Sequence, residues 1–227
     1  MKNSVTLAAL GLLASLAMPG AAMAQSIEPL EKGDTLVRVR GIIIAPQDSS
    51  SGILPTFPGE TVNISNTVVP EVDITYMVTD NVGFELIAAT SPHDINGVTG
   101  TTGSIGELGS TWVLPPTLLA QYHFPTGSAF RPYVGAGLNV TLFYAEDASD
   151  GLEAAVGSTD LELGSSAGIA LQAGFDYALS NKMFFNMDVK WIDIDTDATI
   201  TTQALGVQEV DVSIDPLVVG VGIGWKL

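Results

Sequence analysis

The chain has 227 residues, no cysteine, and 25 acidic against 8 basic residues, and only 15% of its residues are charged. Such an acidic chain lacks the basic surface that binding of nucleic acid requires. Without cysteine it can form neither disulfides nor zinc–thiolate sites. Its mean hydropathy of +0.36 is high for a water-soluble domain, so the apolar side chains must lie either in a core or against lipid.

Residues 1–24 have the features of a secretory signal peptide. Lys2 supplies a positive start, residues 5–18 are apolar, and the small-x-small pattern at residues 22–24 is the one that signal peptidase accepts. The apolar stretch is shorter than the roughly 20 residues that a membrane-spanning helix needs, which argues against a permanent anchor. We therefore expect cleavage before residues 25–227, the mature domain.

Apolar and polar residues alternate with a period of two through the rest of the chain. In the first such segment, Val39 and Ile43 share one parity and Arg40 has the other. This period matches a strand and not a helix. Eight segments follow the pattern: residues 35–45, 68–78, 83–91, 117–124, 131–144, 165–178, 183–194 and 217–227.

Alternation alone leaves open whether the apolar faces point inward, as in a soluble ligand-binding barrel, or outward into lipid. The connections after the second, fourth and sixth segments are short, as at residues 79–82 and 179–182, and the others are long. Short periplasmic turns and long external loops typify outer-membrane barrels. Aromatic residues near the segment ends fit an interfacial girdle: Tyr76, Phe84, Tyr122, Phe124, Tyr177, Phe184, Phe185 and Trp225. We therefore predict an all-β fold, an eight-stranded antiparallel transmembrane β-barrel in the bacterial outer membrane, with both termini periplasmic.

Residues of the opposite parity are expected to line the interior of the barrel. An eight-stranded barrel is just wide enough to be filled by side chains, which excludes an open diffusion pore. In one interpretation the inward charges pair across the interior and hold it shut, because buried charges need partners. In the other, a ligand path exists only in the extracellular half, with an exit sideways between strands. The inward set is Arg38, Arg40, Glu71, Asp73, Glu85, Gln121, Arg131, Asn139, Gln172, Asp176, Asn186, Asp188 and Lys190.

No pattern predicts a catalytic residue, a metal site or a cofactor. His93 lies near Ser91 and Asp94, at a level where some outer-membrane barrels modify lipid A, but nothing marks a positioned triad. A polar strand end is the simpler interpretation. The glycine-rich residues 97–109 are expected to form a flexible external loop, and residues 149–156 a short helix.

Acidic residues in the third and fourth long connections predict a negative outer surface. Such charges are most often simply solvated. The alternative is that divalent cations bridge them to lipopolysaccharide phosphates. The residues are Glu146, Asp147, Asp150, Glu153, Asp160, Glu162, Asp193, Asp195 and Asp197.

Three blocks of the chain resemble the outer membrane protein W (OmpW) family. They are YMVTDNVGFEL at residues 76–86, LPPTL followed by QYHF at residues 114–124, and RPYVGAGLN at residues 131–139. The resemblance extends along essentially the whole mature chain. It implies an eight-stranded barrel with a narrow, apolar interior that passes small hydrophobic molecules across the outer membrane. Leu227 stands where the family has a terminal phenylalanine.

An outer-membrane barrel of this kind is expected to have three kinds of partner. They are outer-membrane lipid and lipopolysaccharide, the outer-membrane insertion machinery and small hydrophobic solutes. The alternative function is a structural or surface-interaction barrel without transport, whose loops serve adhesion or act as a receptor for phage or bacteriocins.

Overall fold

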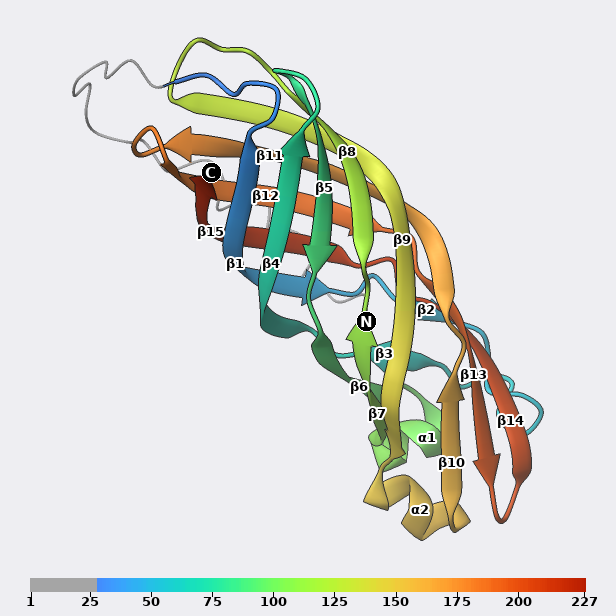
Figure 1. Ribbon diagram of the computed structural model, residues 1–227. Helices are drawn as coiled ribbons and strands as arrows, with labels where there is room; N and C mark the ends of the chain where they lie inside the picture. Colours follow the sequence, from blue (N-terminus) through green and yellow to red (C-terminus); the bar gives the residue numbers. More distant parts are fainter. Residues whose placement is uncertain (1–27) are drawn as a thin grey trace.

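The computed structural model describes residues 28–227, so the predicted signal peptide, residues 1–24, lies outside the described residues. Eight long strands pair antiparallel in a closed ring, in which β9 pairs with β11 and β1 pairs with β15. This confirms the predicted fold class (Figure 1). In ring order the strands are β1 (Thr35–Ala45), β4 (Thr67–Met77), β5 (Val82–Ala88), β8 (Thr117–His123), β9 (Phe130–Ala148), β11 (Ser166–Ala178), β12 (Met183–Ile192) and β15 (Leu217–Lys226).

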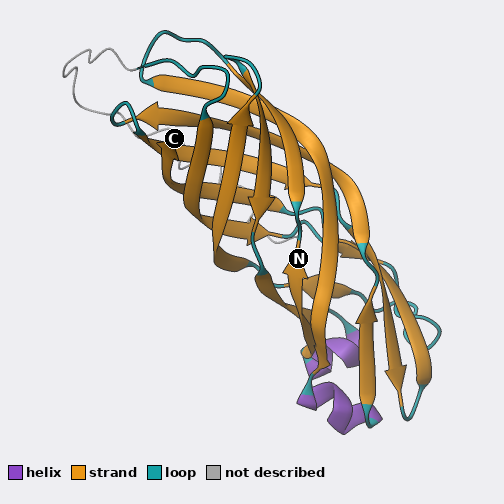
Figure 2. Ribbon diagram, in the orientation of Figure 1, coloured by secondary structure: helices purple, strands orange, loops and turns teal. Residues whose placement is uncertain are grey.

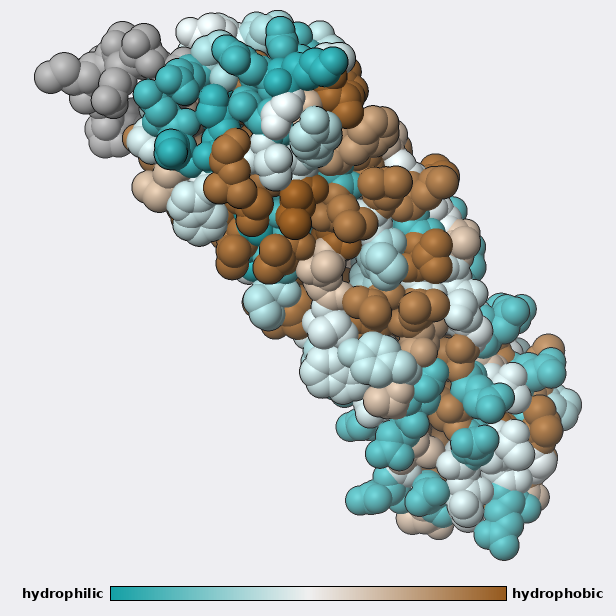
Figure 3. Space-filling view, viewed as in Figure 1, coloured by the Kyte–Doolittle hydropathy of each residue, from teal (hydrophilic) through white to brown (hydrophobic). Residues whose placement is uncertain are grey.

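The strands alternate because successive side chains point to opposite faces of the barrel wall. On β1, Arg38 and Arg40 are buried inside, whereas Val39 and Ile43 are 48% and 51% exposed on the outside. Exposed apolar side chains occur on all eight strands. On the face shown in Figure 3 they form a band between two more hydrophilic ends. Such a band is stable against hydrocarbon and not against water.

The two ends of the barrel differ. Residues 78–81, 124–129 and 179–182 make tight connections at one end, which we call the short-turn end. At the other, the long-loop end, the chain continues as a sheet-rich extension that makes the molecule elongated (Figure 2). The extension comprises β2 (Ser49–Ser50), β3 (Val62–Ile64), β6 (Ser91–Gly97), α1 (Gly100–Ile105), β7 (Glu107–Leu114), α2 (Asp150–Val156), β10 (Thr159–Leu163), β13 (Asp195–Thr202) and β14 (Gly206–Ser213). Within residues 28–227, neither helix is long and apolar enough to cross a membrane.

The prediction of a flexible loop at residues 97–109 is wrong. This segment contains α1 and the start of β7. The carboxylate of Glu60 accepts hydrogen bonds from the backbone N–H groups of Thr101 and Thr102, each at 2.8 Å, and from Thr102 Oγ1 at 2.7 Å. A residue from another connection therefore caps this helix, and no local pattern could reveal it.

The short helix predicted at residues 149–156 is confirmed as α2. Ser149 is its N-cap, and its Oγ accepts a hydrogen bond from the N–H of Leu152 at 3.1 Å. Asp150 and Glu153 lie in the first turn, where negative charge stabilises the positive end of the helix.

The prediction that Phe184 belongs to the outer aromatic girdle is wrong. Tyr76, Phe84 and Tyr122 are roughly half exposed on the outside, but Phe184 is only 1% exposed. It points inward, where the guanidinium groups of Arg38 and Arg131 lie 5.5 and 5.4 Å from its ring centroid. Its ring is therefore part of the interior of the barrel at the short-turn end.

Candidate functional site

Arg38 lies at the centre of the barrel interior. Its Nη1 is 2.8 Å from Asp73 Oδ1 and 3.1 Å from Glu85 Oε1, and its Nη2 is 3.3 Å from Asp176 Oδ2. These partners come from β4, β5 and β11, and all four side chains are shielded from solvent. Removing charges from water is costly, so this arrangement is stable only because each carboxylate has a cation within reach.

A second group of charges lies one layer nearer the long-loop end. Arg40 pairs with Glu71, with Asp73 Oδ2 at 3.1 Å and with Asp188 Oδ2 at 2.5 Å. Lys190 Nζ is 3.4 Å from Glu71 Oε2 and 3.2 Å from Asp188 Oδ2. The two groups share Asp73, so three cations and five carboxylates form one continuous network.

This network spans the whole width of the barrel. Arg38 on β1 stacks over the ring of Tyr133 on β9, the strand opposite it in the ring, with 5.5 Å from Cζ to the centroid. Gln121 Nε2 donates to Gln172 Oε1 at 2.8 Å, and Gln172 Nε2 donates to Asp188 at 2.6 Å. The interior at this level is therefore filled by side chains held in place by hydrogen bonds.

Glycines on β15 make room for the arginine stems. A Cβ on Gly222 would lie 2.7 Å from Arg40 Cα and 2.9 Å from Arg40 Cγ, and a Cβ on Gly224 would lie 3.0 Å from Arg38 Cγ. Both distances below 3.0 Å are shorter than real Cβ contacts. β15 thus contributes space, whereas β1, β4, β5, β11 and β12 contribute the charges of the network.

The structure buries twelve of the thirteen residues assigned to the inward set, and Arg131 is partly buried. It does not bring all of them together. Asn139 lies on the long-loop side of the charges, where its Nδ2 donates to Thr117 Oγ1 at 2.9 Å and to the Pro115 carbonyl at 3.2 Å. Arg131 lies at the short-turn end and makes no ion pair within residues 28–227. The remaining eleven form the network just described or hydrogen-bond to it.

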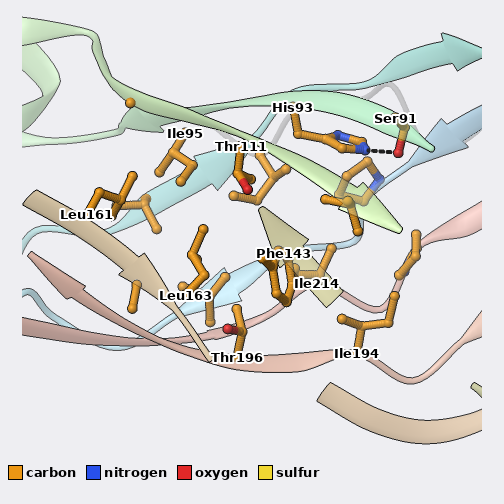
Figure 4. A pocket seen from close by; sticks show the side chains of 18 of the residues that line it. Ser91, His93, Ile95, Thr111, Phe143, Leu161, Leu163, Ile194, Thr196 and Ile214 are labelled. Atoms are coloured by element: carbon orange, nitrogen blue, oxygen red, sulfur yellow. Dashed lines mark hydrogen bonds between the residues drawn. The ribbon is translucent and has the colours of Figure 1, made fainter. Parts of the chain in front are cut away.

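Above the charges, the inside of the extension encloses an apolar cavity of about 70 Å³. This volume is several times what one water molecule occupies. Ile44, Val218 and Ile192 line it near the barrel. The other walls come from β3, β6, β7, β9, α2, β10, β13 and β14. Figure 4 shows Ile95, Phe143, Leu161, Leu163, Ile194 and Ile214 around the space. The predicted interior set contained none of these residues.

The pair Ser91 and His93 also lines this cavity (Figure 4). Ser91 Oγ and His93 Nε2 are 3.0 Å apart, and His93 Nδ1 is 2.9 Å from the backbone oxygen of Ser65. Asp94 lies on the opposite, exposed face of β6. The three residues considered together as a triad are therefore not assembled as one.

The acidic residues of the third and fourth connections lie at the long-loop end. Asp147, Asp150 and Glu153 are exposed, as are most of the others, whereas Glu146 and Asp193 are half-buried. Among residues 28–227, no three acidic or histidine side chains gather closely enough to hold a metal ion. The charges are spread over the surface instead.

A closed eight-stranded barrel with a lipid-facing apolar band defines an outer-membrane β-barrel protein. Residues 31–227 match the model of the OmpW family, and the chain belongs to that family. Outer membrane protein W of Vibrio cholerae is 39% identical over 198 residues, which cover 86% of this chain and 89% of the relative. The protein is thus located in the bacterial outer membrane.

Two further comparisons bear on structure and function. The crystal structure of OprG from Pseudomonas aeruginosa matches with a TM-score of 0.83 at 36% identity, covering 88% of this chain and 99% of that chain. The dibenzothiophene metabolism operon protein PahQ of Pseudomonas aeruginosa is 29% identical over 171 residues, covering 74% of this chain and 75% of the relative.

Proposed function

We propose that this barrel mediates passive passage of small hydrophobic molecules through the apolar cavity of its extension. In this proposal the long-loop end faces the outside of the cell and both termini are periplasmic. A solute enters the cavity from outside and leaves sideways into the membrane. It does not continue along the barrel axis.

The observation that carries the proposal is the change in chemistry inside the molecule. The barrel interior is filled by paired charges from Arg38 to Lys190, and an apolar solute that entered it would separate ions that need each other. The cavity directly above has walls of Ile, Leu, Val and Phe. Transfer of an apolar molecule from water into this cavity is favourable.

An interruption in the wall supports the sideways exit. The ladder between β4 and β5 ends at Val72 opposite Ala88, and pairing on this side resumes only where Ser65 N–H donates to the Asp94 carbonyl at 3.0 Å. Within residues 28–227, residues 67–71 have ladder partners on β1 but none on their other side. Fewer hydrogen bonds need to open there than elsewhere in the ring.

The relatives support the same class of solute. PahQ is named for an operon of dibenzothiophene metabolism, and dibenzothiophene is an apolar aromatic compound. The proposal extends that class of solute, not that compound, to this chain.

The experiment fills the cavity without touching the charges. Ala198 is buried in its wall, so Ala198→Phe should place a ring in the space and lower uptake of naphthalene by proteoliposomes toward that of protein-free vesicles. Ala120→Phe, which adds the same ring on the exposed face of β8, is the matched control and should keep full uptake. Equal uptake with and without the wild-type protein would leave only the surface-interaction role.

We also propose two partners for the surface of the barrel. Leu227 is 77% exposed at the chain end and is available to the insertion machinery. The exposed acids at the long-loop end would face lipopolysaccharide phosphates, to which they require divalent cations as bridges.

A further inference from the structure

The wall of the apolar cavity contains a small polar spot. The side chains that bring polar atoms to the cavity are Ser91, His93, Thr111 and Thr196. Ser91 and His93 lie together on β6, whereas Thr196 lies on β13 across the space (Figure 4). Ser91 is 2% exposed and His93 is 6% exposed, so bulk water does not satisfy them.

The hydrogen-bond directions at this spot follow from its partners. His93 Nδ1 faces the Ser65 carbonyl at 2.9 Å and must carry a proton to bond it. Burial in the cavity lowers the pKa of His93, which keeps the ring neutral, so Nε2 has a lone pair. Ser91 Oγ therefore donates its proton to Nε2 across 3.0 Å.

The two threonines use their protons in the same way. Thr196 Oγ1 donates to the Gly164 carbonyl at 2.7 Å, and Thr111 Oγ1 donates to the Trp112 carbonyl at 3.3 Å. Every hydroxyl proton at the cavity wall is thus already donated to the protein. The hydroxyl oxygens, above all Ser91 Oγ, can therefore still accept a hydrogen bond but have no proton left to donate.

We propose that Ser91 and His93 bind the hydroxyl group of an otherwise apolar solute, so that the preferred class is small alcohols and phenols. The proposal rests on the function proposed above and names its solute class. A solute hydroxyl donates to Ser91 Oγ without breaking the bond between Ser91 and His93. A hydrocarbon makes no hydrogen bond here, and an ether or ketone could bond only if Ser91 released His93.

The energetic difference is modest but measurable. One neutral hydrogen bond in a protein contributes enough to change a dissociation constant by up to about tenfold. The comparison therefore needs two probes of equal shape. We choose 4-fluorophenol and 4-fluorotoluene, which differ by one hydroxyl in place of one methyl and can both be followed by ¹⁹F NMR.

The chain has only two histidines, which permits a direct readout. With ¹⁵N-labelled histidine in the purified barrel, 4-fluorophenol should shift the Nε2 resonance of His93. The resonances of His123, whose ring bonds Gln121 near the short-turn end, should stay in place. A shift at His123 alone, or at neither histidine, overturns the proposal.

The affinity ratio provides the second test. After correction for partition into micelles, 4-fluorophenol should bind up to about tenfold more tightly than 4-fluorotoluene. The double variant Ser91→Ala/His93→Phe should abolish this preference while both probes still bind. Asp94→Asn, next to His93 on the exposed face of β6, should retain it. Equal binding of both probes to the wild type, or a preference that survives the double variant, contradicts the assignment.

Passage is measured separately in proteoliposomes. If the hydroxyl preference is present but neither probe crosses, the polar spot is a binding site and the proposed passage fails. If both probes cross but bind equally, passage stands and the assignment of Ser91 and His93 falls.

Discussion

Four strands of the barrel, β1, β9, β12 and β15, continue from the barrel interior into the wall of the apolar cavity, and the chemistry of the two regions is opposite. On β1 the inward residues Arg38 and Arg40 are followed by Ile42 and Ile44. On β12 the sequence changes from Lys190 to Ile192 within one inward step. Parity thus determines which side chains point inward, while their position along the strand determines whether the interior is charged or apolar.

The difference sets how each region is stabilised. The charged interior depends on the contacts of its five carboxylates with three shared cations, since a buried charge without any partner is strongly unfavourable. The cavity depends on apolar area and tolerates some empty space, because dry apolar cavities need no polar partner. Damage to the first region should therefore be costly and global, and damage to the second smaller and local.

The largest expected effect comes from Arg38→Ala. The change leaves Asp73, Glu85 and Asp176 without their shared cation, and it should lower the free energy of unfolding by about 3 to 5 kcal/mol. Urea unfolding in lipid vesicles measures this. Lys226→Ala removes a cation whose partners include the largely exposed Glu28, and it should cost at most about 1 kcal/mol. Similar losses for the two variants would contradict the role given to the network.

A smaller effect is expected from Gly222→Ala. The new Cβ would meet the backbone of β1 at Val39 and Arg40, so the variant should lose about 1 to 3 kcal/mol, the usual cost of overpacking. Gly41→Ala, where a Cβ meets nothing within 4 Å, is the control in the neighbouring strand and should be close to neutral. The same unfolding assay compares them, and equal stability of both variants would show that β15 does not need its glycines.

The smallest effect is expected in the extension, from Glu60→Gln. Hydrogen bonds from Thr102 and Thr101 lower the pKa of Glu60, so its contribution is complete above the ordinary pKa of about 4.3 and is lost as the pH falls through the lowered value. Hydrogen exchange at the amides of Thr101 and Thr102 should therefore be protected at about pH 6 and lose protection in acid. At about pH 6 the glutamine variant should show less protection than the wild type at the amides of both Thr101 and Thr102. Unchanged protection in the variant would remove Glu60 as the anchor of α1.

The sequence predicted the barrel well because alternation is a local signal. The first strand was expected at residues 35–45 and is observed at Thr35–Ala45. Phe184 was assigned to the girdle because it lies near a strand end, although it shares the parity of Asn186 and Asp188 on β12, which are buried inside.

A ligand path in the extracellular half was one interpretation of the sequence, but the residues of the cavity wall and most of the ordered structure of the extension were not predicted, for a different reason. Their order depends on contacts between residues far apart in the chain, such as Glu60 with Thr102. The cavity walls come from eleven separate elements, so no single stretch of sequence carries the signal. Alternation in residues 195–202 and 206–213, with Ala198, Ile200, Val210 and Val212 buried, is the local pattern that could have indicated part of it.

The measurement that tests this division of the interior most directly is a crystal structure under xenon pressure, because xenon enters dry apolar cavities. Xenon density should appear in the cavity, in contact with Phe143 and Ile194, and none should appear among Arg38, Gln172 and Asn186. Xenon within the charged interior, or a cavity filled by ordered water with no xenon, would contradict the account.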